Sequence, residues 1–366
     1  MRKKLKDVCM FYSGTGFPIQ YQGQTKGEYP FYKVGDIANN AIAGKIYLEL
    51  CNNYISSDVA KMIKGCILPK DTVVFAKIGE ALKLNRRAIT SCDCLIDNNA
   101  MGIAPKLDSL RIQYFYFCMK NLKMQTLAES TTVPSVRKTV LEKYEIEVPS
   151  LVEQEEIEKK LTLTQKIIEK RRQELSYLDE IIKARFVEMF GDPVKNPKGW
   201  EVVTIGDIVT EVRYGTSKPA VEGGKYPYLR MNNLTADGHL DLNDLKYIDI
   251  PDDGIEKCVV RKGDVLFNRT NSIELVGKTV VFDLQEDMII AGYIIRVRLN
   301  KRLLPEILSQ YMNLEALKDI LRSMAKGAVN QANINAQELR SIKVYIPDME
   351  LQKQFIEMKN QVDKSK

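Results

Sequence analysis

An internal duplication constrains this sequence more than any other feature. The segment LKDVCMFYSGTGFP at Leu5–Pro18 is echoed by IGDIVTEVRYGTSKP at Ile205–Pro219, and LPKDTVVFAKIG at Leu68–Gly79 by VRKGDVLFNRTN at Val260–Asn271. Further matches keep the same order at an offset of roughly 200 residues, which is far longer than the period of a solenoid repeat. The chain therefore holds two copies of a whole domain.

Each copy is expected to be a mixed α and β domain followed by a helical tail. Runs rich in β-branched and aromatic residues, bounded by Gly, Asp and Asn, predict strands, and one helix per copy is expected within residues 113–127 and 304–324. The predicted fold class is α+β, with two duplicated β-rich domains joined by long coiled-coil helices in pseudo-twofold symmetry. The expected division is a first domain at 1–149, a central helix at 150–193, a second domain at 194–347 and a short C-terminal helix at 348–366.

The stretch from Leu151 to Phe190 predicts one long helix. It contains neither Pro nor Gly, and Gly191 follows it as a stop signal. An apolar residue recurs at every seventh position beside a more mixed row, which favours a coiled-coil strand over an ordinary amphipathic helix packed on a core. The predicted seam consists of Ile157, Leu161, Ile168, Leu175, Leu178, Ile182 and Met189.

The second tail begins with the same pattern. One helical face carries four apolar residues, Leu351, Phe355, Met358 and Val362. The expected partner of this helix is the central helix, in antiparallel orientation. When the tails are aligned, Lys366 falls opposite Ile168, so the second tail is expected to be truncated. The seam around Leu175, Ile182 and Met189 is then expected to be completed by a partner subunit or by self-association with a second copy of the chain.

The composition argues against several kinds of chemistry. The seven cysteines include no C-x-x-C pair, since Cys92 and Cys94 are the nearest two, so no metal site is expected. There is no G-x-x-x-x-G-K-[ST] motif, and the one histidine, His239, lies in a polar loop. We therefore expect no catalytic residue and no cofactor. The net charge of +6 permits DNA binding without arguing for it.

The sequence also gives expectations about the compartment. No apolar run reaches the ~20 residues that a membrane helix requires. The N-terminus is basic but lacks the long apolar core and the small-residue cleavage site of a signal peptide. A cytoplasmic protein without a membrane partner is expected.

The segment FYSGTGFP, Phe11–Pro18, raises the hypothesis of a methyltransferase, because an aromatic residue before Gly-x-Gly is typical of a loop that holds adenosylmethionine. The Asn/Asp-Pro-Pro-aromatic loop of an amino-methyltransferase has no good match, and Asn196–Trp200 lacks its second proline. In the second copy Ser217 replaces Gly16, whereas the pattern Gly-Thr-x-x-Pro is kept. The retained pattern predicts a turn where each domain begins, with the first glycine permitting the backbone conformation.

Motif order and duplication together resemble the specificity subunit of Type I restriction-modification systems over essentially the whole chain. The most specific likeness lies in FVEMFGDPVKNPKGWEVVTIGDI, Phe186–Ile208, and in the segment Lys326–Ile356, beside the turns at Gly14 and Gly215. The resemblance implies a non-catalytic adaptor with two target recognition domains, each reading one half of a split target in double-stranded DNA. It also implies that the helices set the half-site spacing and dock methyltransferase subunits, to which restriction subunits attach.

Polar residues in the aligned loops are the candidates for reading DNA. Arg and Lys suit contacts with guanine, and Asn and Gln suit contacts with adenine. The loops align between the copies yet differ in residue identity, as two domains that read different bases would. The candidates are Lys33, Lys77, Arg86, Arg87, Arg230, Asn232, Asn233, Asn268, Arg269, Asn271, Asn330, Gln331 and Asn333, with Arg213 and Lys218 as expected phosphate contacts.

Two other interpretations compete with this one. In the first, the chain is a coiled-coil interaction or regulatory paralogue that does not read DNA. In the second, it is a DNA methyltransferase. The second would need an adenosylmethionine domain for which two domain copies leave no room within 366 residues.

Overall fold

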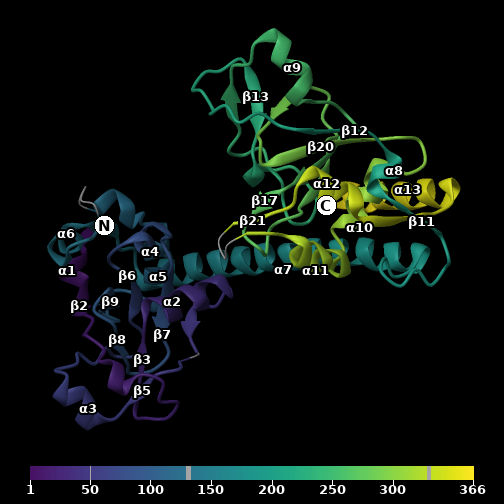
Figure 1. The fold of residues 1–366 in the computed structure, drawn as a ribbon. Coiled ribbons are helices and arrows are strands. Elements are labelled where there is room, and N and C mark those ends of the chain that lie inside the picture. Colours follow the sequence, from purple (N-terminus) through teal and green to yellow (C-terminus); the bar gives the residue numbers. More distant parts are fainter. Residues whose placement is uncertain (50, 129–132, 328–330) are drawn as a thin grey trace. The chain divides into compact units, whose positions relative to one another are not determined.

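The computed structural model describes residues 1–366 except residue 50, residues 129–132 and residues 328–330. The described chain forms two compact units, Met1–Arg171 and Arg172–Lys366. The boundary lies inside the long helix α7 (Leu151–Phe190), so each unit includes one half of that helix. Figure 1 labels helices and strands of both units. Within the described residues, no helix combines the length and the apolar character needed to cross a bilayer.

Unit 1 is built on two sheets and a short outer strand pair. The larger sheet has the order β2-β9-β6-β7-β4, the smaller one β5-β3-β8, and β1 pairs with β10. The strands are β1 (Arg2–Lys4), β2 (Cys9–Ser13), β3 (Tyr29–Tyr32), β4 (Tyr47–Leu48), β5 (Tyr54–Ile55), β6 (Val73–Ala76), β7 (Arg87–Thr90), β8 (Leu95–Ile96), β9 (Ala100–Pro105) and β10 (Glu145–Glu147). The helices are α1 (Leu5–Val8), η1 (Ile19–Tyr21), α2 (Val34–Ile42), α3 (Ser57–Met62), α4 (Glu80–Lys83), α5 (Ile112–Asn121), η2 (Met124–Leu127) and α6 (Lys138–Lys143).

Unit 2 repeats this plan with two four-stranded sheets. Their orders are β12-β20-β16-β18 and β14-β13-β19-β15, and β11-β22 and β17-β21 form separate pairs. The strands are β11 (Glu201–Thr204), β12 (Val209–Tyr214), β13 (Tyr226–Leu229), β14 (Lys246–Ile248), β15 (Val259–Val260), β16 (Val265–Asn268), β17 (Thr270–Asn271), β18 (Thr279–Val281), β19 (Met288–Ile290), β20 (Ile294–Leu299), β21 (Ala332–Asn333) and β22 (Lys343–Ile346). The helices are α8 (Ile205–Ile208), η3 (Met231–Asn233), α9 (Asp252–Cys258), α10 (Pro305–Met312), α11 (Glu315–Met324), α12 (Ala336–Ser341) and α13 (Met349–Ser365).

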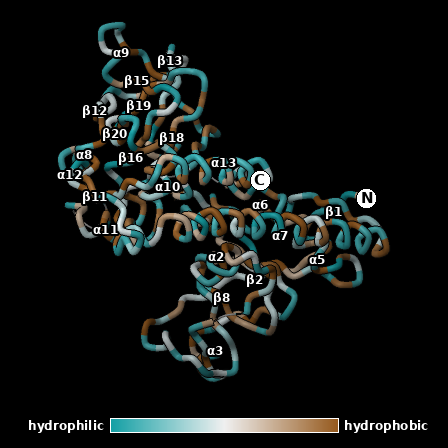
Figure 2. Tube along the Cα trace, turned by 90° about the vertical axis from the view of Figure 1, so that its right-hand side faces the viewer, coloured by the Kyte–Doolittle hydropathy of each residue, from teal (hydrophilic) through white to brown (hydrophobic). Residues whose placement is uncertain are grey.

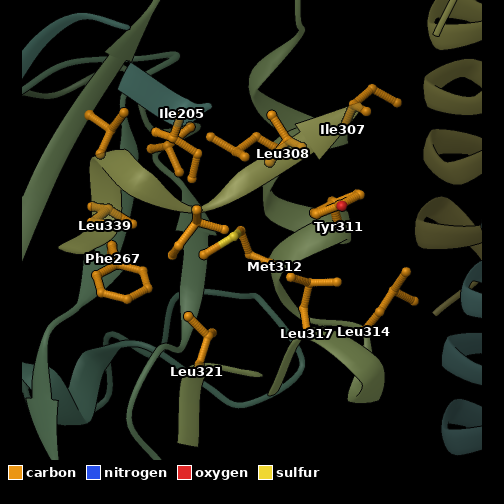
Figure 3. Close-up of a cluster of buried hydrophobic side chains, with 14 of the residues drawn as sticks. Ile205, Phe267, Ile307, Leu308, Tyr311, Met312, Leu314, Leu317, Leu321 and Leu339 are labelled. Carbon is orange, nitrogen blue, oxygen red and sulfur yellow. The ribbon is translucent and has the colours of Figure 1, made fainter. Parts of the chain in front are cut away.

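The core of unit 2 joins its helices to the inner face of one sheet. Figure 3 shows side chains of α8, β16, α10, α11 and α12, among them Ile205, Phe267 and Leu339, gathered into one apolar cluster. Strand β19, with the sequence Met-Ile-Ile, is one of the most apolar segments of the trace (Figure 2). The range 304–324 contains two helices rather than the single predicted one. Asn313 lies at the break, where its amide nitrogen donates to the carbonyl of Thr279 over 2.5 Å.

The duplicated sequence produces duplicated hydrogen bonds. The backbone N–H of Leu5 donates to Tyr144 in unit 1, and that of Ile205 donates to Ile342 in unit 2, both over 2.9 Å. A buried glutamine near the start of the tail helix is also repeated. The amide of Gln154 donates to the carbonyl of Pro149, and its counterpart Gln352 does the same to the corresponding proline. The two domains therefore share a scaffold and not only a sequence pattern.

One pair of contacts differs between the copies in a coordinated way. In unit 1, Glu158 is buried and accepts from Arg111 Nε over 2.7 Å and from the backbone N–H of Tyr114 over 2.9 Å. In unit 2, Leu304 and Ile356 occupy the equivalent places, since Arg111 and Leu304 both donate a backbone N–H to the repeated glutamine. An ion pair in one copy thus corresponds to an apolar pair in the other.

We expect Glu158→Ile alone to destabilise unit 1 by about 1–3 kcal/mol, because two donors lose their acceptor. Adding Arg111→Leu recreates the apolar pair of unit 2 and is expected to recover part of that loss. A double-mutant cycle from urea unfolding measures the coupling. Destabilisation by the double variant that equals the sum of the two single effects would show that the contacts are independent.

The central helix agrees with its predicted bounds, but its seam is covered differently. In unit 2, α13 packs antiparallel against the end of α7, since Phe355 contacts Phe186 and Phe190 while Lys366 Nζ lies 2.5 Å from a carboxylate oxygen of Asp179 (Figure 1). The other predicted residues of α13, Leu351, Met358 and Val362, pack against the same cluster.

The expectation that another molecule completes the seam at Ile182 and Met189 is therefore wrong. Ile182 is buried and Met189 packs on the core of unit 2 within the same chain. Further toward the N-terminal end of α7, Ile157 packs against the core of unit 1. Leu161 and Ile168 are 39% and 47% exposed, whereas Leu175 and Leu178 are half-buried.

A buried lysine gives unit 2 a pH-dependent contribution to stability. Burial of the Lys318 ammonium, with Arg322 nearby, lowers its pKa to about 8, while its Nζ donates to the carbonyl of Gly277 over 2.7 Å. Because the pKa is lower in the folded state than in the unfolded chain, the unfolded state binds more protons between these two values, and stability rises with pH there. We expect the free energy of unfolding of wild type, relative to Lys318→Met, to rise by about 2–3 kcal/mol between about pH 7 and pH 10. Urea titrations at both pH values measure this difference, and a constant or falling difference would contradict it.

Candidate nucleic-acid interface

The Gly-Thr turn ties the start of each domain to a neighbouring strand. In unit 2 the backbone N–H of Thr216 donates to Ile290, and that of Gly292 donates back to Thr216. A Cβ on Gly215 would lie 2.2 Å from the carbonyl oxygen of Ile290, and one on Gly14 would lie 1.7 Å from that of Asp97. Neither glycine has a positive φ. Glycine is thus required for close backbone approach, and the expectation that it provides a special backbone conformation is corrected.

Three segments that lie far apart in the sequence of unit 2 meet beside this turn. Arg269 lies at the centre, because its backbone N–H donates to Tyr293 and its carbonyl accepts from Ile334. The next residues form β17, which pairs antiparallel with β21, so that Thr270 faces Asn333. The Arg269 guanidinium carbon lies 4.9 Å from the ring centroid of Tyr214, at the end of β12. The structure thus brings the predicted residues Arg269, Asn271 and Asn333 to one place.

Two aromatic residues at this place were not predicted from the sequence. Tyr214 is 44% exposed, and its hydroxyl accepts a hydrogen bond from the backbone N–H of Ala336 over 2.7 Å. Tyr293 is 49% exposed and directly follows β19 and its turn. The signal available in the sequence was an aromatic residue immediately before the Gly-Thr turn, which was interpreted only as part of a turn motif.

Three predicted contacts are buried instead. Asn268 is fully buried, with its amide nitrogen donating to Thr270 and Tyr293 and its oxygen accepting from Asn271. Asn233 is buried and bonds to the backbone of Arg230 and Asp241.

Arg87, in unit 1, is buried with its guanidinium donating to Met119, Leu122 and Asn85. The side chains of Asn268, Asn233 and Arg87 are thus buried and form hydrogen bonds within their own unit, so the prediction that they contact DNA is corrected.

The remaining candidates of unit 2 differ in how they are held. Arg213 is exposed and pairs with Glu211 over 2.7 Å, and Arg230 pairs with Asp244 over 2.8 Å. The amide of Asn333 accepts from the Thr270 hydroxyl over 2.8 Å. Exposed candidates are Lys218, Asn232 and Gln331, while Asn330 lies outside the described residues.

Unit 1 presents Lys77 where unit 2 presents Arg269. The backbone N–H of Lys77 donates to Asn99, and its carbonyl accepts from Val136, which repeats both backbone bonds of Arg269. The following residue, Ile78, bridges to Ser135 as Thr270 does to Asn333. The scaffold at this point is the same in the two units, and the side chains differ.

The other candidates of unit 1 lie in two places. Lys33 donates to Gln22 and lies 5.5 Å from the ring centroid of Phe17. Arg86 is half-buried and directly precedes β7.

A buried lysine positions one of the candidate loops of unit 2. Lys278 Nζ donates to the carbonyls of Met231 and Leu234, at the two ends of η3, and burial lowers its pKa. Lys278 could not be predicted from the sequence, because a lysine within a strand-like run is normally expected to be exposed to solvent. Its bonds hold the loop that carries Asn232.

We expect Lys278→Met to destabilise unit 2 by about 1–3 kcal/mol, because the buried carbonyl of Leu234 and the partly buried carbonyl of Met231 lose their donor. Faster hydrogen exchange at residues 231–234 than in wild type is the expected local sign. The matched control is Lys262→Met at an exposed position, which we expect to leave exchange there unchanged. Equal exchange in both variants would contradict the positioning role.

The arrangement provides hydrogen-bond donors and acceptors rather than a reacting centre. No group of three or more His, Cys, Asp or Glu side chains in the described part of the chain is arranged to hold a metal ion. His239 Nδ1 lies 3.3 Å from Asp237, and the hydrogen bond between them holds the pKa of that carboxyl far below its usual range. This pair lies in a pocket of about 610 Å³ together with residues of α10 and α13, and the DNA-reading candidates do not line it.

Comparison with known proteins connects this arrangement to specificity subunits. The chain is 32% identical over 171 residues to the putative type I restriction enzyme MjaX specificity subunit of Methanocaldococcus jannaschii, which covers 46% of this chain and 40% of that protein. It is 24% identical over 250 residues to the type I restriction enzyme EcoKI specificity subunit of Escherichia coli, which covers 64% and 54%. The matches thus span about half the length of these relatives.

A solved structure has the same fold. A chain from work described as the structural basis of complex assembly and conformational transition of the type I R-M system superposes with a TM-score of 0.52 at 17% identity, covering 100% of this chain and 90% of that chain. This likeness confirms the predicted α+β fold of two duplicated domains with a long helix.

The family comparison recognises the duplication. A sequence model described as the Type I restriction modification DNA specificity domain matches residues 1–177 and again residues 197–366. The domain is one that confers specificity on a reaction and does not catalyse it, as the absence of catalytic motifs predicted. The chain therefore belongs to the Type I restriction modification DNA specificity domain family.

Proposed function

We propose that this protein is the DNA-specificity subunit of a Type I restriction-modification complex and that each unit reads one half of a split target. The observation that carries the proposal is the pair of equivalent surfaces described above. The same backbone bonds present Lys77 in unit 1 and Arg269 in unit 2, and the side chains around them differ. Two domains that place different side chains on one scaffold are suited to reading two different short sequences.

The chemistry of the unit 2 surface supports base reading. It combines a guanidinium, the amides of Asn333 and Gln331, and two exposed tyrosines. Guanidinium and amide groups match the acceptor and donor pattern of guanine and adenine in the major groove, while the exposed Arg213 and Lys218 suit phosphate.

Helix α7 supports the proposed docking of methyltransferase subunits, to which restriction subunits would attach. Beyond Leu161 and Ile168, it exposes Leu163 at 60% and Ile167 at 58%. A run of exposed apolar side chains on one helix is typical of a surface that another protein covers. At ~1.5 Å per residue this helix is roughly 60 Å long, which suits a spacer between two groove readings.

Selection from random duplexes tests the proposal. The chain, assembled with its methyltransferase partner, is incubated with random-sequence DNA, and the bound duplexes are sequenced. We expect enrichment of two short fixed sequences separated by a gap of fixed length. Binding without any enriched sequence would favour the alternative, an interaction or regulatory paralogue that does not read DNA.

A further inference from the structure

The charge of Arg269 is held in a different way from that of its neighbours. Eight other arginines of unit 2 pair with carboxylates, namely Arg185, Arg213, Arg230, Arg261, Arg296, Arg298, Arg302 and Arg322. Within the described part of the chain, Arg269 has no carboxylate partner. Its guanidinium is held by the ring of Tyr214 and by a long contact of 3.5 Å to the carbonyl of Gly292. A cation held without a counter-charge keeps its attraction for an external acceptor.

The surroundings fix the place of this guanidinium. The backbone of Arg269 is anchored on both sides by its bonds to Tyr293 and Ile334. Tyr214 is in turn fixed by the hydrogen bond to its hydroxyl from Ala336. A guanidinium that is positioned before binding loses less conformational entropy when it meets its ligand.

The duplication provides an independent second observation. Lys77 occupies the equivalent position in unit 1 and likewise has no carboxylate partner among the described residues. Ser13 is the last residue of β2, and Tyr214 is the last residue of β12. Ser13 pairs with Met101, and Tyr214 pairs with the equivalent residue of unit 2, Ile295. Ser13 therefore occupies the position in unit 1 that Tyr214 occupies in unit 2. Each unit thus presents one uncompensated cation at the same point, and only unit 2 adds the aromatic support that a planar guanidinium uses.

We propose that Arg269 is a specificity-determining residue of unit 2 that recognises one guanine through two hydrogen bonds, and that Tyr214 is its positioning residue. Guanine offers two acceptors, N7 and O6, on its major-groove edge, which match the forked donors of arginine. Lys77 contacts the corresponding position of the other half-site as a point charge. This inference rests on the proposed function.

The test compares variants of the full chain, assembled with its methyltransferase partner, in the same selection from random duplexes. We expect one half of the wild-type target to contain a guanine. The variants Arg269→Ala and Arg269→Lys are expected to lose the requirement for this guanine, and discrimination between guanine and the other bases at that position is expected to fall about 10- to 100-fold. The other half-site stays unchanged. Lys77→Ala is expected to change only the half-site that the Arg269 variants leave intact.

Tyr214 is tested by two variants that separate its ring from its hydroxyl. Tyr214→Phe keeps the ring and is expected to retain the guanine preference. Tyr214→Ala removes the ring and is expected to weaken the base preference at the same position of the DNA target as Arg269→Lys does. A role of Tyr214 in folding alone would lower the melting temperature without changing which base is preferred.

Each outcome distinguishes this inference from the function on which it rests. The matched control, Arg322→Ala, removes an ion-paired arginine of α11 and is expected to leave the target unchanged. A wild type without an enriched sequence overturns the proposed function, and the inference with it. An enriched wild-type target that Arg269→Lys and Arg269→Ala leave unchanged overturns the inference alone. So does a uniform loss of affinity for all sequences, which identifies a phosphate contact.

Discussion

Phe186→Ala is expected to destabilise unit 2 by about 3–5 kcal/mol, which is the usual cost of removing a fully buried aromatic side chain. Phe186 is 0% exposed and packs edge to face against Phe190 and Phe355, with ring centroids 4.8 and 5.2 Å away. These rings join the last turns of α7 to α13 and to the core of unit 2. Equilibrium unfolding in urea, followed by circular dichroism, measures the loss.

The neighbouring residue is the control for this prediction. Val187 lies on the same turn of α7 but is 41% exposed, and Val187→Ala is expected to change stability by less than about 0.5 kcal/mol. The comparison separates loss of packing from a general effect on the helix. Similar effects of the two substitutions would contradict the antiparallel packing of α13 on α7.

Gly215→Ala is expected to destabilise unit 2 by about 3 kcal/mol or more, at the upper end of what overpacking costs, because the obstacles are backbone atoms. The added Cβ would lie 2.2 Å from the carbonyl oxygen of Ile290 and 2.3 Å from that of Ala291. The turn would have to leave the strand, and its hydrogen bonds through Thr216 would be lost. Thermal unfolding measures the loss, and Gly14→Ala is expected to act in the same way on unit 1.

Gly16 provides the matched control for the glycine prediction. A Cβ at Gly16 meets nothing within 4 Å, so Gly16→Ala is expected to leave stability within about 0.5 kcal/mol of wild type. A cofactor-binding loop would show the opposite order, with Gly16 the sensitive position. Strong destabilisation by Gly16→Ala and tolerance of Gly215→Ala would therefore contradict our account of the turn.

The features that could be predicted from the sequence are those set by local pattern or by repetition. Helix α7 has the predicted bounds because forty residues that are mostly strong helix formers, without Pro or Gly, favour one continuous helix, and Gly191 then adopts a positive φ that ends it. The duplication placed Arg269 opposite Lys77 correctly, because insertions between the copies are short. The packing of Phe355 on α7 followed from the apolar face of the second tail.

The features that could not be predicted depend on contacts between distant segments. Asn268 and Arg87 have the composition of exposed loop residues, yet both are buried because backbone carbonyls from other segments surround them. Ile182 resembled an uncovered seam residue because the sequence does not show that Phe186 and Phe190 widen the apolar face for α13. Similarly, Lys278 acquires its role only when η3 folds back over it.

Mapping of methylated adenines tests the central claim most directly. The chain is co-expressed with the methyltransferase subunit that is proposed as its partner, in cells that lack other methylation, and the modified positions in the genome are sequenced. We predict methylation within one split motif, with two short specified halves and an unspecified gap of constant length, since the proposed function has each unit read one half of the target. Complete absence of methylation, or a single continuous motif, would contradict the claim.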